Sequence, residues 1–240
     1  MLVVVAPVIV LTLAFAWWYR ASNKRATYRP DWEYSGQIEL VVWSIPAMVV
    51  LLLAGVTWIS SHDLDPAAKL QSDATPVRIE VVSLDWKWLF IYPDQQVAAV
   101  NQLVVPAGTP IEFMLTSATV ITAFFVPQLG TQIYTMPGMT THLNLQADHA
   151  GDYPGLSSHF SGDGFSDMRF TVHAVPAAEF TRWVEQSRSA MPALSDAAYS
   201  DLARTSSNAP VQTFGSVRPM LYEHILQTAA PMAGASSKER

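Results

Sequence analysis

The segment Gly155-Leu-Ser-Ser-His-Phe-Ser-Gly-Asp-Gly-Phe-Ser-Asp-Met168 places hydroxyl, imidazole and thioether side chains close together in the sequence. Copper centres in proteins select soft thiolates and borderline imidazoles, and serine hydroxyls cannot replace these ligands. The whole chain contains no cysteine, so no other segment can supply a thiolate and no disulfide can form. The segment therefore lacks the thiolates that a copper centre built on thiolate and imidazole ligands requires.

Short apolar runs surround this segment from Thr75 to about Val175. The runs are rich in Val, Ile, Phe and Thr, and Pro and Gly break them at short intervals, which is typical of an antiparallel sandwich or barrel. Large apolar area for its core comes from Trp86, Trp88, Phe113 and Phe125. The predicted strands are 77–82, 87–92, 102–105, 111–117, 122–126, 131–133, 140–147, 151–156 and 169–174.

The region 176–240 is predicted to be a C-terminal helical segment followed by a flexible tail. Residues 177–187 have helical periodicity, and a second short helix is expected from Ser195, as N-cap, to Arg204. Beyond Thr205 the composition turns to Ser, Ala, Pro and Met with little periodicity. We therefore expect the tail to be poorly ordered or to lie along a partner.

Two apolar runs near the N-terminus predict a two-helix transmembrane hairpin over residues 1–62. Residues 1–19 are apolar throughout, and residues 40–59 form a run of about twenty residues, which matches a hydrocarbon core of roughly 30 Å. A cleavable secretory signal is the alternative for the first run. That alternative is disfavoured because the run is long and its basic residues follow it rather than precede it.

The connector between the two runs, residues 20–38, sets the expected orientation. It carries Arg20, Lys24, Arg25 and Arg29, and short loops rich in Lys and Arg face the cytoplasm. We therefore expect a cytoplasmic connector, with both chain termini and the β domain on the outer side of the membrane.

The segment 155–168 resembles the copper-binding loop in subunit II of the haem-copper respiratory oxidases, whose pattern is Cys-Ser-Glu-x-Cys-Gly-x-x-His-x-x-Met. In this frame serines replace both bridging cysteines, a histidine replaces the glutamate, a phenylalanine replaces the loop histidine, and only the methionine matches. The upstream strand 119–124 has a threonine where the family has its first histidine. The degenerate copper-ligand positions are Thr122, Ser157, His159, Ser161, Phe165 and Met168. The resemblance thus implies that this chain binds no metal and no other cofactor.

Three further stretches, residues 19–24, 81–93 and 127–139, resemble the version of subunit II found in cytochrome bo-type ubiquinol oxidases. Together the matches cover roughly residues 1 to 185. The resemblance implies a cupredoxin-like Greek-key β-barrel over residues 75–175, periplasmic and without copper. It also implies subunit II of a proton-translocating ubiquinol oxidase of the bacterial inner membrane, which reduces dioxygen to water.

The resemblance places the catalytic centres elsewhere, with haems and active-site copper in oxidase subunit I, so no catalytic residue is expected in this chain. The implied partners are subunit I, further small membrane subunits, lipid and quinol, and the implied role is structural and in assembly. Nucleic-acid binding is not expected, because basic stripes and phosphate loops are absent. The net charge of −6 could suit a basic cytochrome c, but a docking site without an electron acceptor would have no purpose.

Two groups of residues are candidates for specific roles. Glu39 directly precedes the second apolar run, where an ionisable group is either an ordinary interfacial carboxylate or a functional one. The resemblance, through Glu39-Leu-Val-Val-Trp43, implies a proton entrance into subunit I. Asp85, Trp86 and Trp88 resemble an aromatic region beside subunit I, and we expect these residues at the subunit interface, with Asp85 and Lys87 hydrogen-bonding across it.

Other interpretations remain at this stage. A replacement metal site could use His142, His149, His159 and His173, but their spacing fits no compact ligand cluster. A membrane-anchored periplasmic binding or assembly module with a cupredoxin-like fold would have the same topology. A cytochrome c oxidase subunit with copper would need thiolates, which the chain does not contain.

Overall fold

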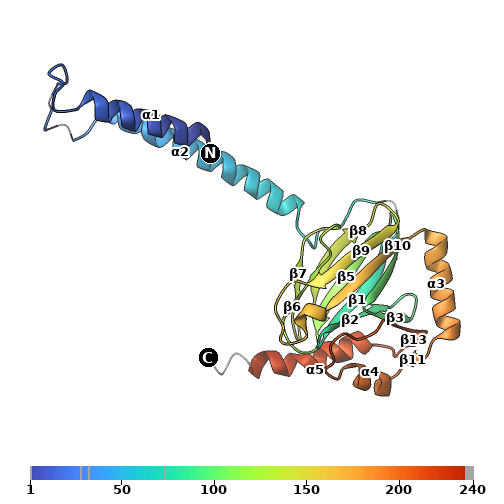
Figure 1. Ribbon diagram of the computed structural model, residues 1–240. Helices are drawn as coiled ribbons and strands as arrows, with labels where there is room; N and C mark the ends of the chain where they lie inside the picture. Colours follow the sequence, from blue (N-terminus) through green and yellow to red (C-terminus); the bar gives the residue numbers. More distant parts are fainter. Residues whose placement is uncertain (1, 28, 32, 73, 236–240) are drawn as a thin grey trace. The chain divides into compact units, whose positions relative to one another are not determined.

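The computed structural model describes residues 2–27, 29–31, 33–72 and 74–235. Its contacts divide the chain into two units, Met1–Ser60 and Ser61–Arg240. The first unit holds helix α1 (Leu2–Trp18) and most of helix α2 (Gly36–Asp63), shown in blue in Figure 1. No residue of either helix is buried within the chain. Helix α2 is long and apolar enough to cross a membrane, whereas α1 is a shorter apolar helix of 17 residues.

The second unit is built on two β-sheets that face each other. The larger sheet has the strand order β12-β3-β2-β1-β5-β8 and the other has the order β4-β10-β9-β6-β7. The larger sheet contains β1 (Val77–Leu84), β2 (Lys87–Tyr92), β3 (Val97–Val100), β5 (Pro110–Ser117), β8 (Thr141–Gln146) and β12 (Gln212–Phe214). The other sheet contains β4 (Gln102–Pro106), β6 (Thr122–Phe125), β7 (Ile133–Thr135), β9 (Gly151–Ser157) and β10 (Arg169–Val175).

The sandwich is not purely antiparallel, which corrects the expectation from the sequence. Strand β1 pairs in parallel with β5, and β4 pairs in parallel with β10. Both pairs join strands that are distant in the sequence, because the chain crosses to the opposite sheet between them and returns in the same direction. The nine predicted strands correspond in order to β1, β2 and β4 to β10, while β3, β11, β12 and β13 were not predicted.

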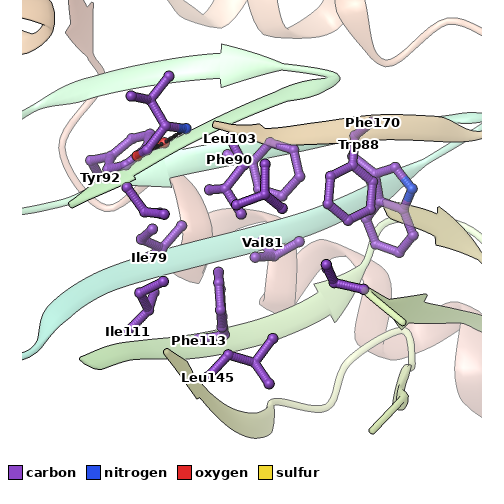
Figure 2. Packing of buried hydrophobic residues seen from close by; sticks show 14 of the residues in the cluster. Ile79, Val81, Trp88, Phe90, Tyr92, Leu103, Ile111, Phe113, Leu145 and Phe170 are labelled. Atoms are coloured by element: carbon purple, nitrogen blue, oxygen red, sulfur yellow. Dashed lines mark hydrogen bonds between the residues drawn. The ribbon is translucent and has the colours of Figure 1, made fainter. Parts of the chain in front are cut away.

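Aromatic rings fill the space between the two sheets. Trp88 and Phe90 of β2 point into this core beside Phe170 of β10, as Figure 2 shows. The rings of Phe124 and Phe170 stack with centroids 5.0 Å apart, and the Trp88 ring meets Phe124 edge-on at 5.4 Å. Each such pair adds about 0.5–1.5 kcal/mol beyond the buried area. A side chain at Gly155 would put its Cβ 2.2 Å from the Phe170 ring, so this position has to be glycine.

Helix α3 (Ala177–Ala190) extends the same core at one side of the sandwich (Figure 1). Its Phe180 and Val184 belong to the core between the sheets. The Trp183 ring lies 5.3 Å from the ring of Tyr92, whose hydroxyl is buried and donates to the carbonyl oxygen of Val104. The apolar side of this helix thus attaches it to the sandwich. In the sequence this side is visible as apolar residues that recur every three to four positions.

The region beyond Thr205 differs from the flexible tail that the sequence suggests. It contains β12, which pairs antiparallel with β3, and β13 (Ser216–Val217), which pairs in parallel with β11 (Ala193–Leu194). It continues into helix α5 (Leu221–Ala235), while α4 (Asp196–Leu202) precedes it. These elements cover the outer face of the larger sheet, where a second apolar cluster comprises Val82, Leu84, Leu89, Ile91, Ala98, Val100, Leu194, Phe214, Leu221, Tyr222 and Ile225. The correction has a physical reason, because a sheet that is apolar on both faces needs cover on both.

Candidate functional site

The first degenerate ligand position, Thr122, is part of a buried hydroxyl cluster. Thr122 is 1% exposed, and its Oγ1 lies 2.8 Å from Oγ of Ser83 and 2.6 Å from Oγ1 of Thr135. Ser83 and Thr135 are also fully buried. The three hydroxyl groups therefore satisfy one another, as buried polar groups must. They leave Thr122 with no role as a metal ligand.

The loop that follows β9 is closed at its base by Ser157 and Met168. The Ser157 N–H donates to the carbonyl oxygen of Met168 at 3.0 Å, and the Ser157 hydroxyl donates to the carbonyl oxygen of His159 at 3.2 Å. Met168 is 1% exposed and belongs to the core between the sheets. Its thioether is thus part of the apolar packing, although its position in the sequence matches a copper ligand.

The outer part of the loop carries the remaining ligand positions. The His159 ring is exposed, with Nδ1 3.1 Å from the carbonyl oxygen of Phe160 and its plane edge-on to Tyr134 at 5.6 Å. The rings of Phe160 and Phe165 are 5.6 Å apart, and Phe160 is 70% exposed. The Ser161 hydroxyl is buried and has no hydrogen-bond partner among the residues that the structure describes.

This donor set does not fit a two-copper centre. The positions offer hydroxyl groups, a phenyl ring, one exposed imidazole and one buried thioether, and the chain has no thiolate. Within the described ranges, no group of three or more His, Asp or Glu residues lies together in a way that could hold a metal ion.

Trp86, one of the expected interface residues, fixes this loop instead. It occupies the tight β1–β2 turn with a φ of 60°, a left-handed conformation that is strained for a bulky residue. Its Nε1 donates to the carbonyl oxygen of Ser161 at 3.0 Å, and its ring lies against Gly162 and Gly164. Trp86 remains half-buried, so its outer surface is still available to a partner.

The expected interface role is wrong for Trp88 and Lys87. Trp88 is completely buried in the core of this domain, because side chains alternate along β2 and position 88 points between the sheets. Lys87 points to the other face, is 1% exposed, and its Nζ donates to the carbonyl oxygens of Leu202 at 3.0 Å and Arg204 at 2.7 Å. Burial lowers the pKa of Lys87, while the negative charge of Asp85 acts in the opposite direction.

Asp85 is also engaged within the chain. Its Oδ2 accepts a hydrogen bond of 2.9 Å from the Thr205 hydroxyl. Together with Lys87, it ties the β1–β2 hairpin to the segment after α4, and these are contacts inside the domain rather than across an interface.

Glu39, the proton-entry candidate, lies in the first turn of α2 and is exposed. Its Oε2 accepts a hydrogen bond of 3.2 Å from Nε1 of Trp43, one helical turn further on. A carboxylate in the first turn also suits the positive end of the helix. The Glu-x-x-x-Trp spacing in the sequence therefore corresponds to a direct contact between the two side chains.

Glu80 is a notable acid that the sequence reading passed over. It lies on β1, is 8% exposed, and burial followed by the charge of Glu223 raises its pKa to about 7, although Arg78 acts in the opposite direction. It lines a pocket of about 160 Å³ together with Glu223 and Arg218. The signal was present in the sequence, because Glu80 interrupts the apolar run of a predicted strand.

Comparisons with known proteins agree with the geometry of the domain. Residues 49–175 match the family described as "Cytochrome C oxidase subunit II, periplasmic domain", and residues 188–228 match "COX Aromatic Rich Motif". The chain is 50% identical to cytochrome bo(3) ubiquinol oxidase subunit 2 of Pseudomonas aeruginosa over 226 residues, which cover 94% of this chain and 68% of that protein. It is 48% identical to ubiquinol oxidase subunit 2 of Acetobacter aceti, covering 94% of this chain and 74% of the relative. Among solved structures, the periplasmic domain of subunit II of cytochrome oxidase (CoxB) of Bradyrhizobium japonicum is 26% identical, with a TM-score of 0.46, covering 49% of this chain and 94% of that one.

Proposed function

Because this chain belongs to the oxidase subunit II family, we propose that it is subunit II of a proton-translocating ubiquinol oxidase of the bacterial inner membrane. The observation that carries this proposal is the set of degenerate ligand positions, which hold hydroxyl groups, a phenyl ring, one exposed imidazole and one buried thioether and so offer no thiolate to a two-copper centre. Without thiolates, these positions cannot hold the two-copper centre that would take electrons from a soluble donor. Quinol within the membrane is then the fitting reductant.

The overall reaction of the complex would oxidise two ubiquinol molecules to ubiquinone and reduce one dioxygen molecule to two water molecules. The four electrons and four protons of the two quinols balance the reduction of dioxygen. Haems and the active-site copper in subunit I would supply the redox chemistry. The residues of this chain would hold the assembly together and conduct a proton toward subunit I.

Membrane attachment through both apolar helices completes the proposed topology. Helix α2 meets the length and composition of a spanning helix, and α1 would be the second, shorter span. The guanidinium of Arg20 lies 5.1 Å from the centre of the Trp17 ring at the end of α1, a pairing suited to a membrane surface. The connector would lie in the cytoplasm, and both termini and the β domain would lie in the periplasm.

Exposed apolar side chains around the degenerate loop are the proposed contact with subunit I. They belong to neighbouring segments, since β6 pairs with β7 and the Ser158 N–H donates to the carbonyl oxygen of Ala123. Contiguous apolar surface on a soluble domain marks an interaction site. These side chains, between 46% and 70% exposed, are Val120, Ile121, Tyr134, Met139 and Phe160, and the name "loop patch" is used for them below.

Glu39 is the proposed proton entrance. Glu39 lies in the first turn of α2, and in the proposed topology its carboxylate would lie at the edge of the hydrocarbon layer, where an ionisable group is a candidate for a function. The Trp43 indole holds this carboxylate by a hydrogen bond and so limits its orientations.

The experiment that tests the function is purification of the complex through a tag on this chain. Haem spectra, metal content and oxygen uptake with ubiquinol and with reduced cytochrome c are then recorded. We expect haem-containing material that is active with ubiquinol and inactive with cytochrome c. Recovery of this chain alone, without haem, would remove the oxidase assignment and favour the membrane-anchored binding or assembly module.

A further inference from the structure

Glu80 is a buried carboxylate underneath helix α5. It shares the outer face of the larger sheet with Val82 and Leu84, since side chains alternate along β1 and both neighbours belong to the apolar cluster under α5. Glu80 is 8% exposed, yet no hydrogen bond from a described residue reaches its carboxylate. The carboxylate faces the pocket of about 160 Å³, and ionising a largely buried acid without a protein donor costs free energy, which favours the neutral form.

The first turn of α5 lies over Glu80 and brings a second acid to it. Leu221 and Tyr222 are 2% and 4% exposed and anchor this turn on the sheet. Glu223, half-buried, lines the same pocket as Glu80. Met220 precedes the helix with a φ of 57° and accepts the His224 N–H at 3.1 Å, so the chain turns sharply as it enters α5.

The nearby cations are already paired with other acids. Arg78, on the same strand, donates to Asp94 through Nη2 at 2.5 Å and through Nε at 3.2 Å. Arg218, before α5, donates to Asp196 at 2.5 Å. Neither guanidinium donates to Glu80, and Asp94 adds a further negative charge.

The other titratable groups on this side of the sheet do not neutralise a negative charge on Glu80. Tyr222 has its pKa raised to about 12 by burial, so it is neutral, and its hydroxyl donates to Thr140. His142 on β8 stands in the same register row as Glu80 but with Met114 between them, and it is exposed, as is His224 on α5. Glu112 on β5 lies opposite Arg78 rather than Glu80.

From this geometry we propose that Glu80 and the first turn of α5 form a pH-dependent latch between the C-terminal helix and the sheet. While Glu80 is protonated, α5 stays docked, because the neutral acid does not repel the carboxylate of Glu223. When Glu80 loses its proton, repulsion from Glu223 and the demand of the carboxylate for water favour release of residues 217–229 from the sheet.

The direction follows from the cause of the pKa change. Burial first, and Glu223 second, raise the pKa of Glu80 from 4.5 to about 7, so the docked state binds more protons than the released state. Docking is therefore strongest below pH 4.5, weakens as the pH rises toward about 7, and levels off above that value. If release returns the pKa to 4.5, raising the pH from about 5.5 to about 8 increases the opening equilibrium by up to about 30-fold.

The compartment that the latch senses rests on the proposed function, which places the β domain in the periplasm. An outer side acidified by proton release would keep α5 docked, and an alkaline one would loosen it. Release exposes the apolar face formed by Leu221, Tyr222 and Ile225. The conformational change itself depends only on residues of this domain, so it can be tested without measuring oxidase activity.

The test is amide hydrogen exchange of the full chain in its purified detergent-solubilised form, at about pH 5.5, 6.5 and 8 after correction for intrinsic exchange. Peptides from 221–229 report on the latch, and peptides from α3 serve as an internal reference. We expect the opening equilibrium of 221–229 to rise roughly 10- to 30-fold across this range, with α3 unchanged. A flat profile for 221–229 in the wild-type chain would overturn the latch.

Variants assign the effect to the proposed pair. Glu80→Gln keeps the shape of the side chain without the charge, so the opening equilibrium of 221–229 should no longer depend on pH. Glu223→Gln should reduce the rise of this equilibrium with pH, because the repulsion between the two carboxylates is gone. His142→Gln, which replaces a histidine in the same register row of the sheet, should keep the wild-type profile. An unchanged pH response in Glu80→Gln, or its loss in His142→Gln, would contradict the proposal. Oxidase activity is a separate readout, so its failure would affect the proposed function and not the latch.

Discussion

The indole ring of Trp86 occupies the space that a side chain at Gly164 would need. A Cβ at position 164 would lie 2.3 Å from the Cδ2 atom of the ring, and the same indole donates to the carbonyl oxygen of Ser161. The β1–β2 turn and the loop after β9 are therefore fitted to each other. Trp86 thus holds the middle of this loop by a hydrogen bond and by ring contact.

Gly164→Ala should separate the loop from Trp86. The added methyl group overlaps the ring, and overpacking of this kind costs about 1–3 kcal/mol of unfolding free energy. Thermal unfolding of the purified chain measures the loss, and limited proteolysis of residues 158–167 should become faster. Gly55→Ala is the matched control, because no atom lies within 4 Å of a Cβ there. Equal stability of the Gly164→Ala and wild-type chains would show that the ring can move aside freely.

Thr122→Val should weaken the fold although valine has nearly the same shape. The substitution removes the hydroxyl that links Ser83 and Thr135 and leaves two buried polar groups short of a partner, at about 1–2 kcal/mol. Thr181→Val, on the exposed side of α3, controls for the replacement of threonine by valine as such. Denaturant unfolding compares the two variants, and a Thr122→Val chain as stable as the control would mean that the cluster contributes nothing.

Glu39→Ala should slow proton-coupled haem reduction in the assembled complex. Loss of the carboxylate removes the proposed proton acceptor at the start of α2, and a barrier increase on the order of 1.4 kcal/mol corresponds to about tenfold in rate. Glu33→Ala, in the connector, is the control for loss of a nearby acid. Rapid-mixing spectroscopy of the haems provides the measurement. Unchanged kinetics in an assembled Glu39→Ala complex would exclude Glu39 as the proton entrance.

Phe160→Ser should weaken retention of subunit I. Aromatic anchors at interfaces commonly contribute more than 1 kcal/mol, and Phe160 is the most exposed member of the loop patch at 70%. Val211→Ser, at a residue 57% exposed outside the patch, should leave retention unchanged. Co-purification of haem with the tagged chain measures retention, while thermal unfolding of the chain alone should change by less than about 0.5 kcal/mol. Normal haem recovery with Phe160→Ser would remove this residue from the contact.

The β domain could be predicted largely from the sequence, because its strands are apolar runs separated by Pro and Gly. The predicted strands 87–92 and 151–156 lie within one residue of β2 and β9 at both ends. Strand pairing could not be predicted, because parallel pairs such as β1–β5 depend on how the chain crosses between sheets. The three residues of β12 are too few to show a period, and they form a strand only because β3 offers an open edge.

The candidate site was predictable where residue identity decides the chemistry. The absence of thiolates follows directly from the sequence, and hydroxyls at positions 122 and 157 correspond to buried hydrogen bonds in the structure. The sequence allowed both a core and an interface role for Trp88, and the packing of its strand between the sheets decides for the core. Glu80 interrupts an apolar strand in the sequence, but its burial follows only from the position of α5, which the sequence did not predict.

The edge position of β12 has a practical consequence for work on the isolated outer domain. A fragment ending at residue 175 would leave β3 with unpaired backbone groups and would uncover Leu89 and Ile91 on the adjacent strand. Open sheet edges recruit strands from other molecules, so such a fragment would aggregate. A soluble expression fragment therefore has to extend from residue 61 to at least residue 229, which makes the C-terminal segment part of the smallest unit that can be crystallised or titrated.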